Sequence, residues 1–290
     1  MTVSGCGSPA TTVLLGAFLM LAGAIVGGAL PLYVGITGNG ADLTSGVAAG
    51  CLVGCVLGVI LPEAFHVIQD MHKPSGEQDS EHQGEGVEEW LIGIILIAGY
   101  LGMLALSNLL PHSHTSSHQI GLNTGLHGAA KEKKGVGMRR LLVGLVAHSV
   151  ADGLAVGAAG LANNACVTLL VGVAMVLHKG PVAFGFTTYL LSTGESKPAI
   201  QQGLLIFSVA SPAAAIITYG LHDWVPALQE ANNIGLVMIF SAGSFLYVAC
   251  SHVLPEVAHK SGSLSSGQLT AIFLGSLLPL LLSSFVGHGH

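Results

Sequence analysis

The sequence predicts an all-α polytopic membrane protein that crosses the bilayer eight times. Hydrophobic residues make up 51% of its 290 positions, charged residues make up only 8%, and the mean hydropathy is +0.71. Soluble domains usually contain about 25% charged residues, so this composition excludes a soluble fold. The apolar residues also gather into runs of roughly 20 residues or more, the length that a helix needs to cross a bilayer.

Eight such runs follow one another and predict a single transmembrane domain over residues 1–290. They are residues 11–36, 42–70, 89–111, 138–161, 165–192, 199–221, 233–258 and 267–287. The first ten residues contain no Lys or Arg, so the basic start of a signal peptide is missing and the first run is expected to be a retained helix. The second run is long and rich in glycine, so it is expected to tilt or bend.

The basic residues predict the orientation of the chain. Five of the nine Lys and Arg residues lie in or beside the connection 112–137, and the positive-inside rule places that connection in the cytosol. Counting helices outwards from it puts Lys197 and Lys260 on the same side. The acidic loop 71–88 and both termini then lie outside the cytosol or in a lumen.

Both of these long loops contain histidines. His72 and His82 lie in the acidic loop, and a second group lies in the cytosolic loop: His112, His114, His118 and His127. Neutral imidazole is a good zinc ligand, so the loops are candidates for loose metal binding. A solvated linker without bound metal is the alternative reading.

A short motif occurs twice and predicts an inverted repeat. The second run ends in LPEAFH, residues 61–66, and the seventh ends in LPEVAH, residues 254–259. Because these two helices run in opposite directions, the two copies lie at opposite membrane faces. Glu63 with His66, and His252 with Glu256, are therefore candidate polar relays at the two mouths of a pathway. Chance similarity of two proline-containing helix ends is the alternative.

The fourth run carries His148 and Asp152 in the middle of an otherwise apolar stretch. Charged groups inside the membrane are costly, so they mark functional sites by default. The spacing of four places both side chains on one helix face. Since the run begins near residue 138, the pair lies roughly 15 Å deep, close to the bilayer midplane.

The fifth run carries His178 and Lys179 at a similar depth. Two imidazoles and one carboxylate form a three-ligand set that suits Zn²⁺ and leaves a position for water or a passing group. The same ligands suit Mn²⁺ or Fe²⁺, so ligand type alone does not select the metal. We expect His148, Asp152 and His178 to bind the ion, and Lys179 to pair with Asp152 rather than to extend towards the headgroups.

These residues resemble the ZIP (Zrt/Irt-like) family of metal transporters. The resemblance rests on His148-Ser149-x-x-Asp152-Gly153 and His178-Lys179-Gly180-Pro181, together with the LPEAFH and AGSFLYVACSHVLPE stretches. It covers the whole membrane domain and implies eight helices in a 3+2+3 arrangement, with the termini outside the cytosol. The function that it implies is movement of divalent metal, chiefly zinc, into the cytosol.

The resemblance also implies a two-metal centre, from which this sequence departs. Ser149 stands where the family often has Asn, Lys179 where it often has a carboxylate, and Val182 where a bridging Glu or His is usual. The second metal thereby loses its strongest ligands. We therefore expect one central metal, with the ammonium of Lys179 in place of the second cation.

Two other classes of function remain open at this stage. An intramembrane zinc hydrolase would use metal-bound water, and a receptor would bind metal without carrying it. A homodimer is possible, and no nucleic-acid partner is expected. The resemblance favours the Golgi or secretory pathway, with the plasma membrane second.

Overall fold

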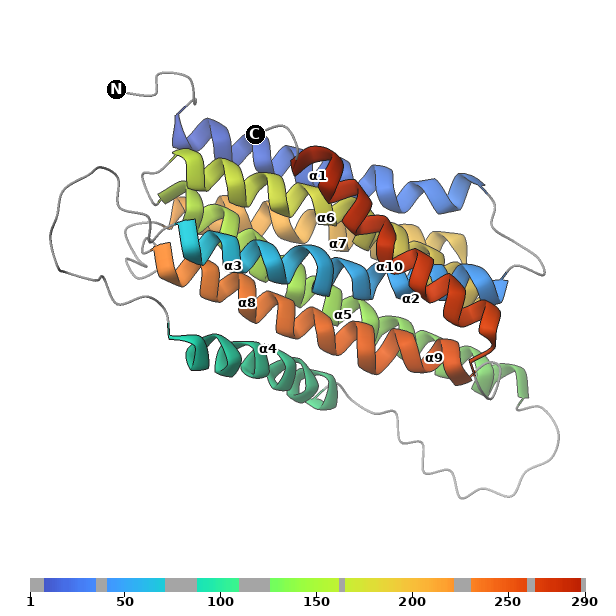
Figure 1. The fold of residues 1–290 in the computed structure, drawn as a ribbon. Coiled ribbons are helices and arrows are strands. Elements are labelled where there is room, and N and C mark those ends of the chain that lie inside the picture. The colour runs from blue at the N-terminus through green and yellow to red at the C-terminus, as the bar shows by residue number, and fades with distance from the viewer. Residues whose placement is uncertain are drawn as a thin grey trace, which may run out of the picture.

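The computed structural model describes residues 8–34, 41–70, 88–109, 126–161, 165–221, 231–259 and 264–287. Within these ranges the chain is helical and contains no strand, as Figure 1 shows. The helices are α1 (Pro9–Val34), α2 (Ala41–Cys55), η1 (Val56–Ile60), α3 (Leu61–Asp70), α4 (Glu89–Leu109), α5 (Leu126–Leu161), α6 (Ala165–Ser192), α7 (Lys197–Gly220), α8 (Ala231–Val248), η4 (Ala249–Val253), α9 (Leu254–His259) and α10 (Ser266–Gly287). The prediction of an all-α membrane fold is confirmed.

Two pairs of these α-helices are joined end to end by a short π-helix, so the described residues form eight continuous rods. Seven of the rods contain a segment that is long and apolar enough to cross a membrane. The eighth, α6, has 28 residues and is therefore about 42 Å long, more than the roughly 30 Å of a hydrocarbon core. Large apolar side chains on the outer helices are exposed, such as Leu14 at 55% and Ile97 at 57%, as lipid-facing surfaces require.

The boundary of α5 differs from the prediction. The sequence placed residues 126–137 in a cytosolic loop, but they form the first three turns of α5, which begins at Leu126. The whole helix has 36 residues and is about 54 Å long, so it extends beyond the bilayer. Hydropathy marks only the part within the membrane, which begins at Met138 as predicted. Most of the two long loops, residues 71–87 and 110–125, lies outside the described residues.

The two copies of the repeated motif have the same irregular backbone. The π-helical turn Val56–Ile60 comes directly before Leu61 and Pro62, and Ala249–Val253 comes directly before Leu254 and Pro255. Proline lacks the N–H that an α-helix needs at that position, and a π-turn accommodates one additional residue in the helix. The expected irregularity of the second helix is therefore a π-turn, and the seventh helix has one at the equivalent place.

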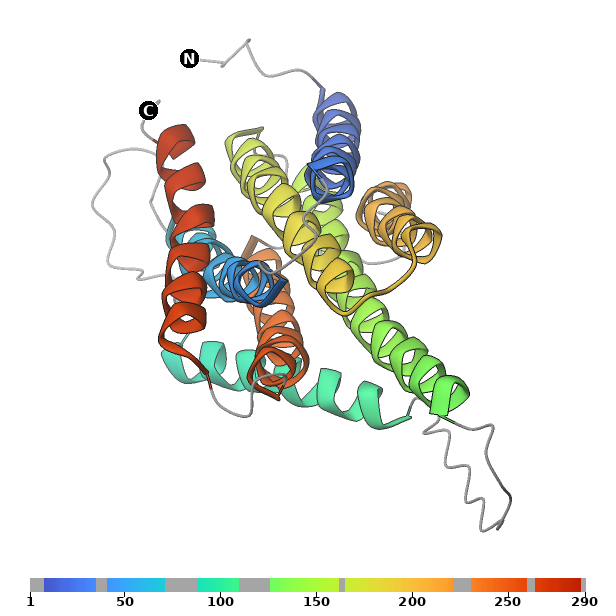
Figure 2. The ribbon, with the colours of Figure 1, turned by 90° about the vertical axis from the view of Figure 1, so that its right-hand side faces the viewer.

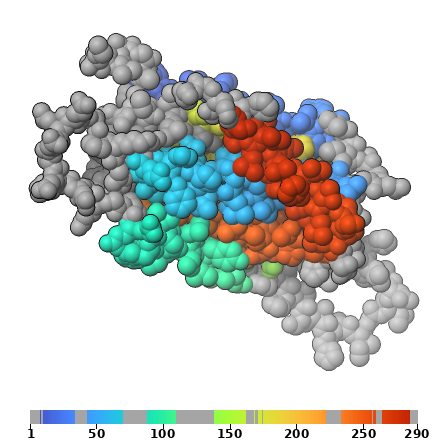
Figure 3. Space-filling model, in the orientation of Figure 1, coloured from blue at the N-terminus to red at the C-terminus, as the bar shows by residue number. Residues whose placement is uncertain are grey.

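The rods pack as two groups of four. One group contains α1, α5, α6 and α7, and the other contains α2–η1–α3, α4, α8–η4–α9 and α10; Figure 2 looks along the bundle and separates them. Figure 3 shows the second group from outside, where α10, α3, α8 and α4 form one continuous face. The two groups meet chiefly where α5 packs on α8 and α6 packs on α2.

The packing pairs agree with an inverted repeat. In chain order the rods contain α1, α2, α4, α5, α6, α7, α8 and α10. An inverted repeat exchanges α1 with α7, α2 with α8, α4 with α10, and α5 with α6. This exchange maps the α1–α6 contact onto α7–α5, the α2–α10 contact onto α8–α4, and the α2–α6 contact onto α8–α5. Each of these six pairs packs closely in the structure. This arrangement leaves α5 and α6 as the central pair that the predicted 3+2+3 arrangement requires.

Candidate metal centre

The predicted ligands meet between α5 and α6. His148 and Asp152 lie one turn apart on α5, and His178 comes from α6. All three side chains are buried, with at most 2% of their surface exposed, and one ligand atom from each lies within 4.8 Å of the others. Among the described residues, this is the group of His, Cys, Asp and Glu side chains whose geometry could hold a metal ion.

One oxygen of Asp152 is the point on which the nitrogens converge. Its Oδ2 lies 3.3 Å from His148 Nε2, 3.1 Å from His178 Nε2 and 2.8 Å from Lys179 Nζ. Zinc bonds to imidazole and carboxylate are about 2.0–2.2 Å long, so a small inward or outward shift of these side chains would admit the ion. The cluster thus offers three protein ligands and an open position.

Lys179 is fully enclosed, with 1% of its surface exposed. Its ammonium donates to Asp152 Oδ2 and, over 2.9 Å, to Ser149 Oγ, and it lies 4.9 Å from the centre of the Phe207 ring. The predicted pairing of Lys179 with Asp152 is confirmed, and an extended side chain at the headgroups is excluded. Ser149 acts as an acceptor for this ammonium.

Val182 is buried in the apolar core. It packs in a cluster with Ala183, Phe186 and other aliphatic and aromatic side chains. This environment provides no oxygen or nitrogen ligand from position 182. The expectation of a single central metal stays a prediction.

An aromatic residue and a serine on α8 complete the site, and sequence reasoning missed both. Phe245 on α8 stacks on the His148 ring, with centroids 4.4 Å apart and an interplanar angle of 16°. Ser241, one turn earlier on α8, lies 2.7 Å from both His148 Nδ1 and Asp152 Oδ1. No spacing rule connects α8 with α5, so only the packing of the two helix groups brings these side chains together.

Close packing of α5 on α7 holds the first two ligands in place. A Cβ atom on Gly153 would overlap the carbonyl oxygen of Ser211 and lie 2.6 Å from the Ala214 Cβ. Ser211 also donates from Oγ to the backbone carbonyl of Ser149 over 2.6 Å. Glycine next to Asp152 is thus required by the close approach of α7.

The three candidate relay residues whose side chains the structure describes, Glu63, His66 and His252, do not join this cluster. His66 is exposed and Glu63 is half-buried on α3, and the Glu256 side chain lies outside the described part of the structure. His252 lies on η4, half-buried, with its ring edge-on to Tyr247 at 5.3 Å. Its Nε2 is buried without a hydrogen-bond partner. The loop histidines at 72, 82, 112, 114 and 118 lie outside the described residues, and the side chain of His127 is not described.

Cys51 and Cys55 lie on α2 where that helix meets α6. Both are fully buried, and the Cys51 thiol donates to the carbonyl oxygen of Pro181 over 3.4 Å. Buried cysteine behaves as a small apolar residue with a weak hydrogen-bond donor, and packing of this kind accounts for both cysteines.

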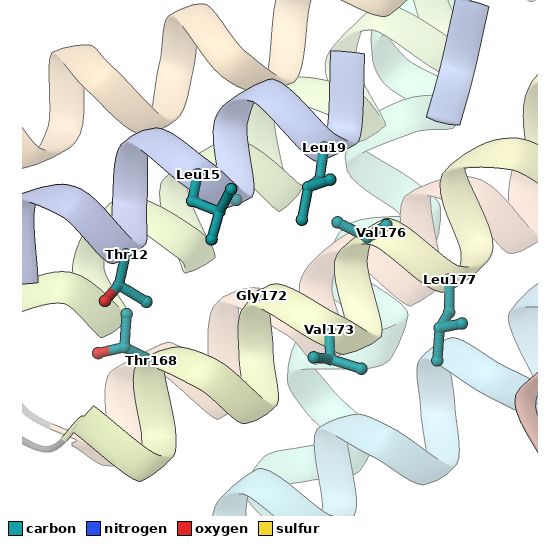
Figure 4. A pocket seen from close by; sticks show the side chains of 9 residues that line it. Thr12, Leu15, Leu19, Thr168, Gly172, Val173, Val176 and Leu177 are labelled. Carbon is teal, nitrogen blue, oxygen red and sulfur yellow. The ribbon is translucent and has the colours of Figure 1, made fainter. Parts of the chain in front are cut away.

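A groove between α1 and α6 is separate from the metal centre. Figure 4 shows Leu15 and Leu19 on α1 facing α6, where Gly172 and Val176 lie on the opposite wall. Its lining is apolar apart from Thr12 and Thr168 and contains no ionisable side chain. This groove has no ligands for a metal ion.

The chain is similar to proteins of one family along almost its whole length. A profile described as ZIP Zinc transporter matches residues 126–283. The zinc transporter ZIP9 of Xenopus tropicalis is 34% identical over 93% of this chain and 96% of its own length. ZIP9-B of Xenopus laevis is 35% identical over 97% and 99%, and ZIP9 of Micropogonias undulatus is 34% identical over 93% and 96%.

Proposed function

Because the chain belongs to the ZIP zinc transporter family, we propose that it carries zinc into the cytosol through the cluster of His148, Asp152 and His178. Its relatives bear the names of transporters, which makes an enzyme the wrong class for this chain. The observation that carries the proposal is the convergence of two imidazole nitrogens on Asp152 Oδ2, with all three side chains buried inside the helix bundle. Zinc is the substrate that the names of the relatives support, and Mn²⁺ and Fe²⁺ are further candidates for the same ligands.

The ligand set suits a carrier better than a storage site. Three protein ligands leave part of the coordination sphere of zinc to water, whereas a structural zinc site encloses the ion with four. An ion that passes through must also leave, so binding has to remain reversible. The incomplete shell is consistent with release on either side.

We propose that the centre holds one zinc ion and that the ammonium of Lys179 replaces a second. The support is the 2.8 Å contact between Lys179 Nζ and Asp152 Oδ2 and the apolar surroundings of Val182. An ion pair with additional hydrogen bonds offsets part of the cost of burying each charge. Ser149 and Phe207 supply those additional contacts to Lys179.

Movement of one four-helix group against the other would open the site to alternate sides of the membrane. His148, Asp152 and His178 all lie on the group of α1, α5, α6 and α7. They would therefore travel together, and the sequence has no GxxxxGK[ST] motif for direct use of ATP. Metal would move down its own gradient or with a coupled ion.

Zinc flux into liposomes tests the proposal. The purified full-length chain is reconstituted into vesicles loaded with a zinc-sensitive dye, and Asp152→Ala is compared with Glu195→Ala, which removes a carboxylate at the α6–α7 turn. We expect zinc entry for the unaltered chain and for Glu195→Ala, and none for Asp152→Ala. Zinc binding without flux in the unaltered chain would indicate a receptor, and metal-dependent hydrolysis without flux would indicate an enzyme.

We further propose a multi-pass location in Golgi or secretory-pathway membranes, or in the plasma membrane, with both termini outside the cytosol. The distribution of Lys and Arg supports this orientation. Protease protection of terminal epitope tags in sealed microsomes measures it, and crosslinking in intact membranes tests for a homodimer.

A further inference from the structure

Ser241 on α8 connects the metal ligands of one helix group to the other group. The side chain is fully buried, and its Oγ lies 2.7 Å from His148 Nδ1 and 2.7 Å from Asp152 Oδ1. Both partners belong to α5, whereas α8 belongs to the opposite group of rods. One hydroxyl therefore contacts two of the three predicted ligands from across the boundary between the groups.

The hydrogen-bonding capacity of the groups fixes which atom donates. An ionised carboxylate only accepts, so the single hydrogen of the Ser241 hydroxyl must go to Asp152 Oδ1. The hydroxyl oxygen then accepts from His148, which places the imidazole hydrogen on Nδ1. If the Ser241 hydroxyl instead donated to His148 Nδ1, its oxygen and Asp152 Oδ1 would lie 2.7 Å apart with no hydrogen between them.

This assignment leaves His148 Nε2 with a lone pair, and the lone pair has no partner. His148 Nε2 is buried without a hydrogen bond, although Asp152 Oδ2 lies only 3.3 Å away. Two electron-rich atoms at that separation repel each other unless a cation lies between or beside them. A metal-binding imidazole needs this arrangement, with its other nitrogen donating to a fixed acceptor.

We propose that Ser241 is a positioning residue for zinc, which holds His148 in the tautomer with a free Nε2 and fixes the orientation of the Asp152 carboxylate. Because Ser241 acts from α8, the ligands are held in this way only while α5 and α8 keep their present register. Sliding of the two groups breaks both hydrogen bonds and lowers zinc affinity. The inference rests on the proposed zinc site. It gives a physical reason why the zinc affinity of that site would differ between conformations.

The test compares Ser241→Ala with Ser241→Thr and Ser244→Ala. Thr keeps the hydroxyl, and Ser244 is a buried serine on the same helix whose Oγ donates to the Ser241 carbonyl and contacts no ligand. Loss of a group that orients a metal ligand typically weakens affinity about 10- to 100-fold. For Ser241→Ala we therefore expect the zinc dissociation constant and the KM for zinc to rise about 10- to 100-fold. For Ser241→Thr and Ser244→Ala we expect both values to stay near those of the unaltered chain.

The tautomer of His148 is a second readout that needs no zinc. In ¹⁵N-histidine-labelled protein, with His148 assigned by comparison with His148→Gln, we expect Nδ1–H in the unaltered chain and a different or mixed tautomer in Ser241→Ala. A folded Ser241→Ala protein with unchanged tautomer and unchanged zinc affinity would overturn the inference. Absence of zinc binding in the unaltered chain would instead refute the zinc site, while the tautomer experiment would still test Ser241. If Ser241→Ala does not fold, Ser241→Val, which has the shape of Ser241→Thr but no hydroxyl and no metal ligand, takes its place with the same criteria.

Discussion

Replacing Lys179 with methionine is the sharpest test of the single-metal centre. The change keeps a long side chain in the enclosed space between α5, α6 and α7 but removes the ammonium that contacts Asp152 Oδ2 over 2.8 Å. Asp152 then keeps its negative charge inside the bilayer with only the two imidazoles and the uncharged Ser241 hydroxyl beside it. We expect the zinc-free protein to be less stable and to bind zinc more tightly.

The distances give the size of both effects. At 2.8 Å the attraction between the two charges is about 6 kcal/mol for an effective dielectric constant of about 20, and breaking one side of a buried pair typically costs about 3–5 kcal/mol. A divalent ion on Oδ2 would lie roughly 5 Å from Nζ, where the repulsion is about 7 kcal/mol at the same dielectric constant. The net effect is smaller than this repulsion, because the ammonium can give up its contact with Asp152 and keep those with Ser149 and Phe207. We therefore expect zinc to bind about 10- to 100-fold more tightly in Lys179→Met, or about 1.4–3 kcal/mol.

Calorimetric titration with zinc, thermal unfolding with and without zinc, and vesicle flux measure these effects. The variant should melt at a lower temperature without zinc, gain more stability from zinc than the unaltered chain, and transport more slowly because release is slower. Lys197→Met, at the exposed first residue of α7, removes the same charge away from the site and should change none of these quantities. Unchanged zinc affinity and unchanged maximal rate in Lys179→Met would refute the role of the ammonium.

Two further predictions concern packing and the ends of the pathway. Gly153→Ala forces α5 away from Ser211, so we expect a lower melting temperature and a raised KM for zinc; Gly172→Ala, whose Cβ meets no atom within 4 Å, should leave both near their original values. His66→Ala and His252→Ala should slow zinc flux by less than about tenfold without abolishing it, because neither side chain contacts Asp152. Complete loss of flux in either histidine variant, with the protein folded, would show that the central cluster is not sufficient.

The part of the site that local periodicity controls was predictable from the sequence. His148 and Asp152 face the same way because they are four residues apart on a helix, and the fifth apolar run supplied His178 at a matching depth. The pairing of Lys179 with Asp152 followed from the cost of leaving either charge alone in the membrane. Each of these inferences needs only helix geometry and the free-energy cost of placing a charged group inside the membrane.

The contacts between the two helix groups were not predictable in the same way. Ser241 lies 89 positions after Asp152, and serine is common in membrane helices, so nothing in its local sequence distinguishes it from Ser244. α5 begins earlier than hydropathy predicts, because its first turns have high helix propensity but low hydropathy. Residues 129–134 are alanine, lysine and glutamate, which are strong helix formers but polar on average.

The pairing of Lys179 with Asp152 has a simple electrostatic consequence. A two-metal centre built from several carboxylates carries net negative charge when it is empty, and that charge is costly within the bilayer. In this chain the charges of Asp152 and Lys179 cancel, so with both imidazoles neutral the empty centre would carry no net charge. A carrier must return without its cargo, and a neutral empty site lowers the cost of that step. On the proposed function, Lys179 therefore reduces affinity for zinc and in exchange favours the return of the empty carrier.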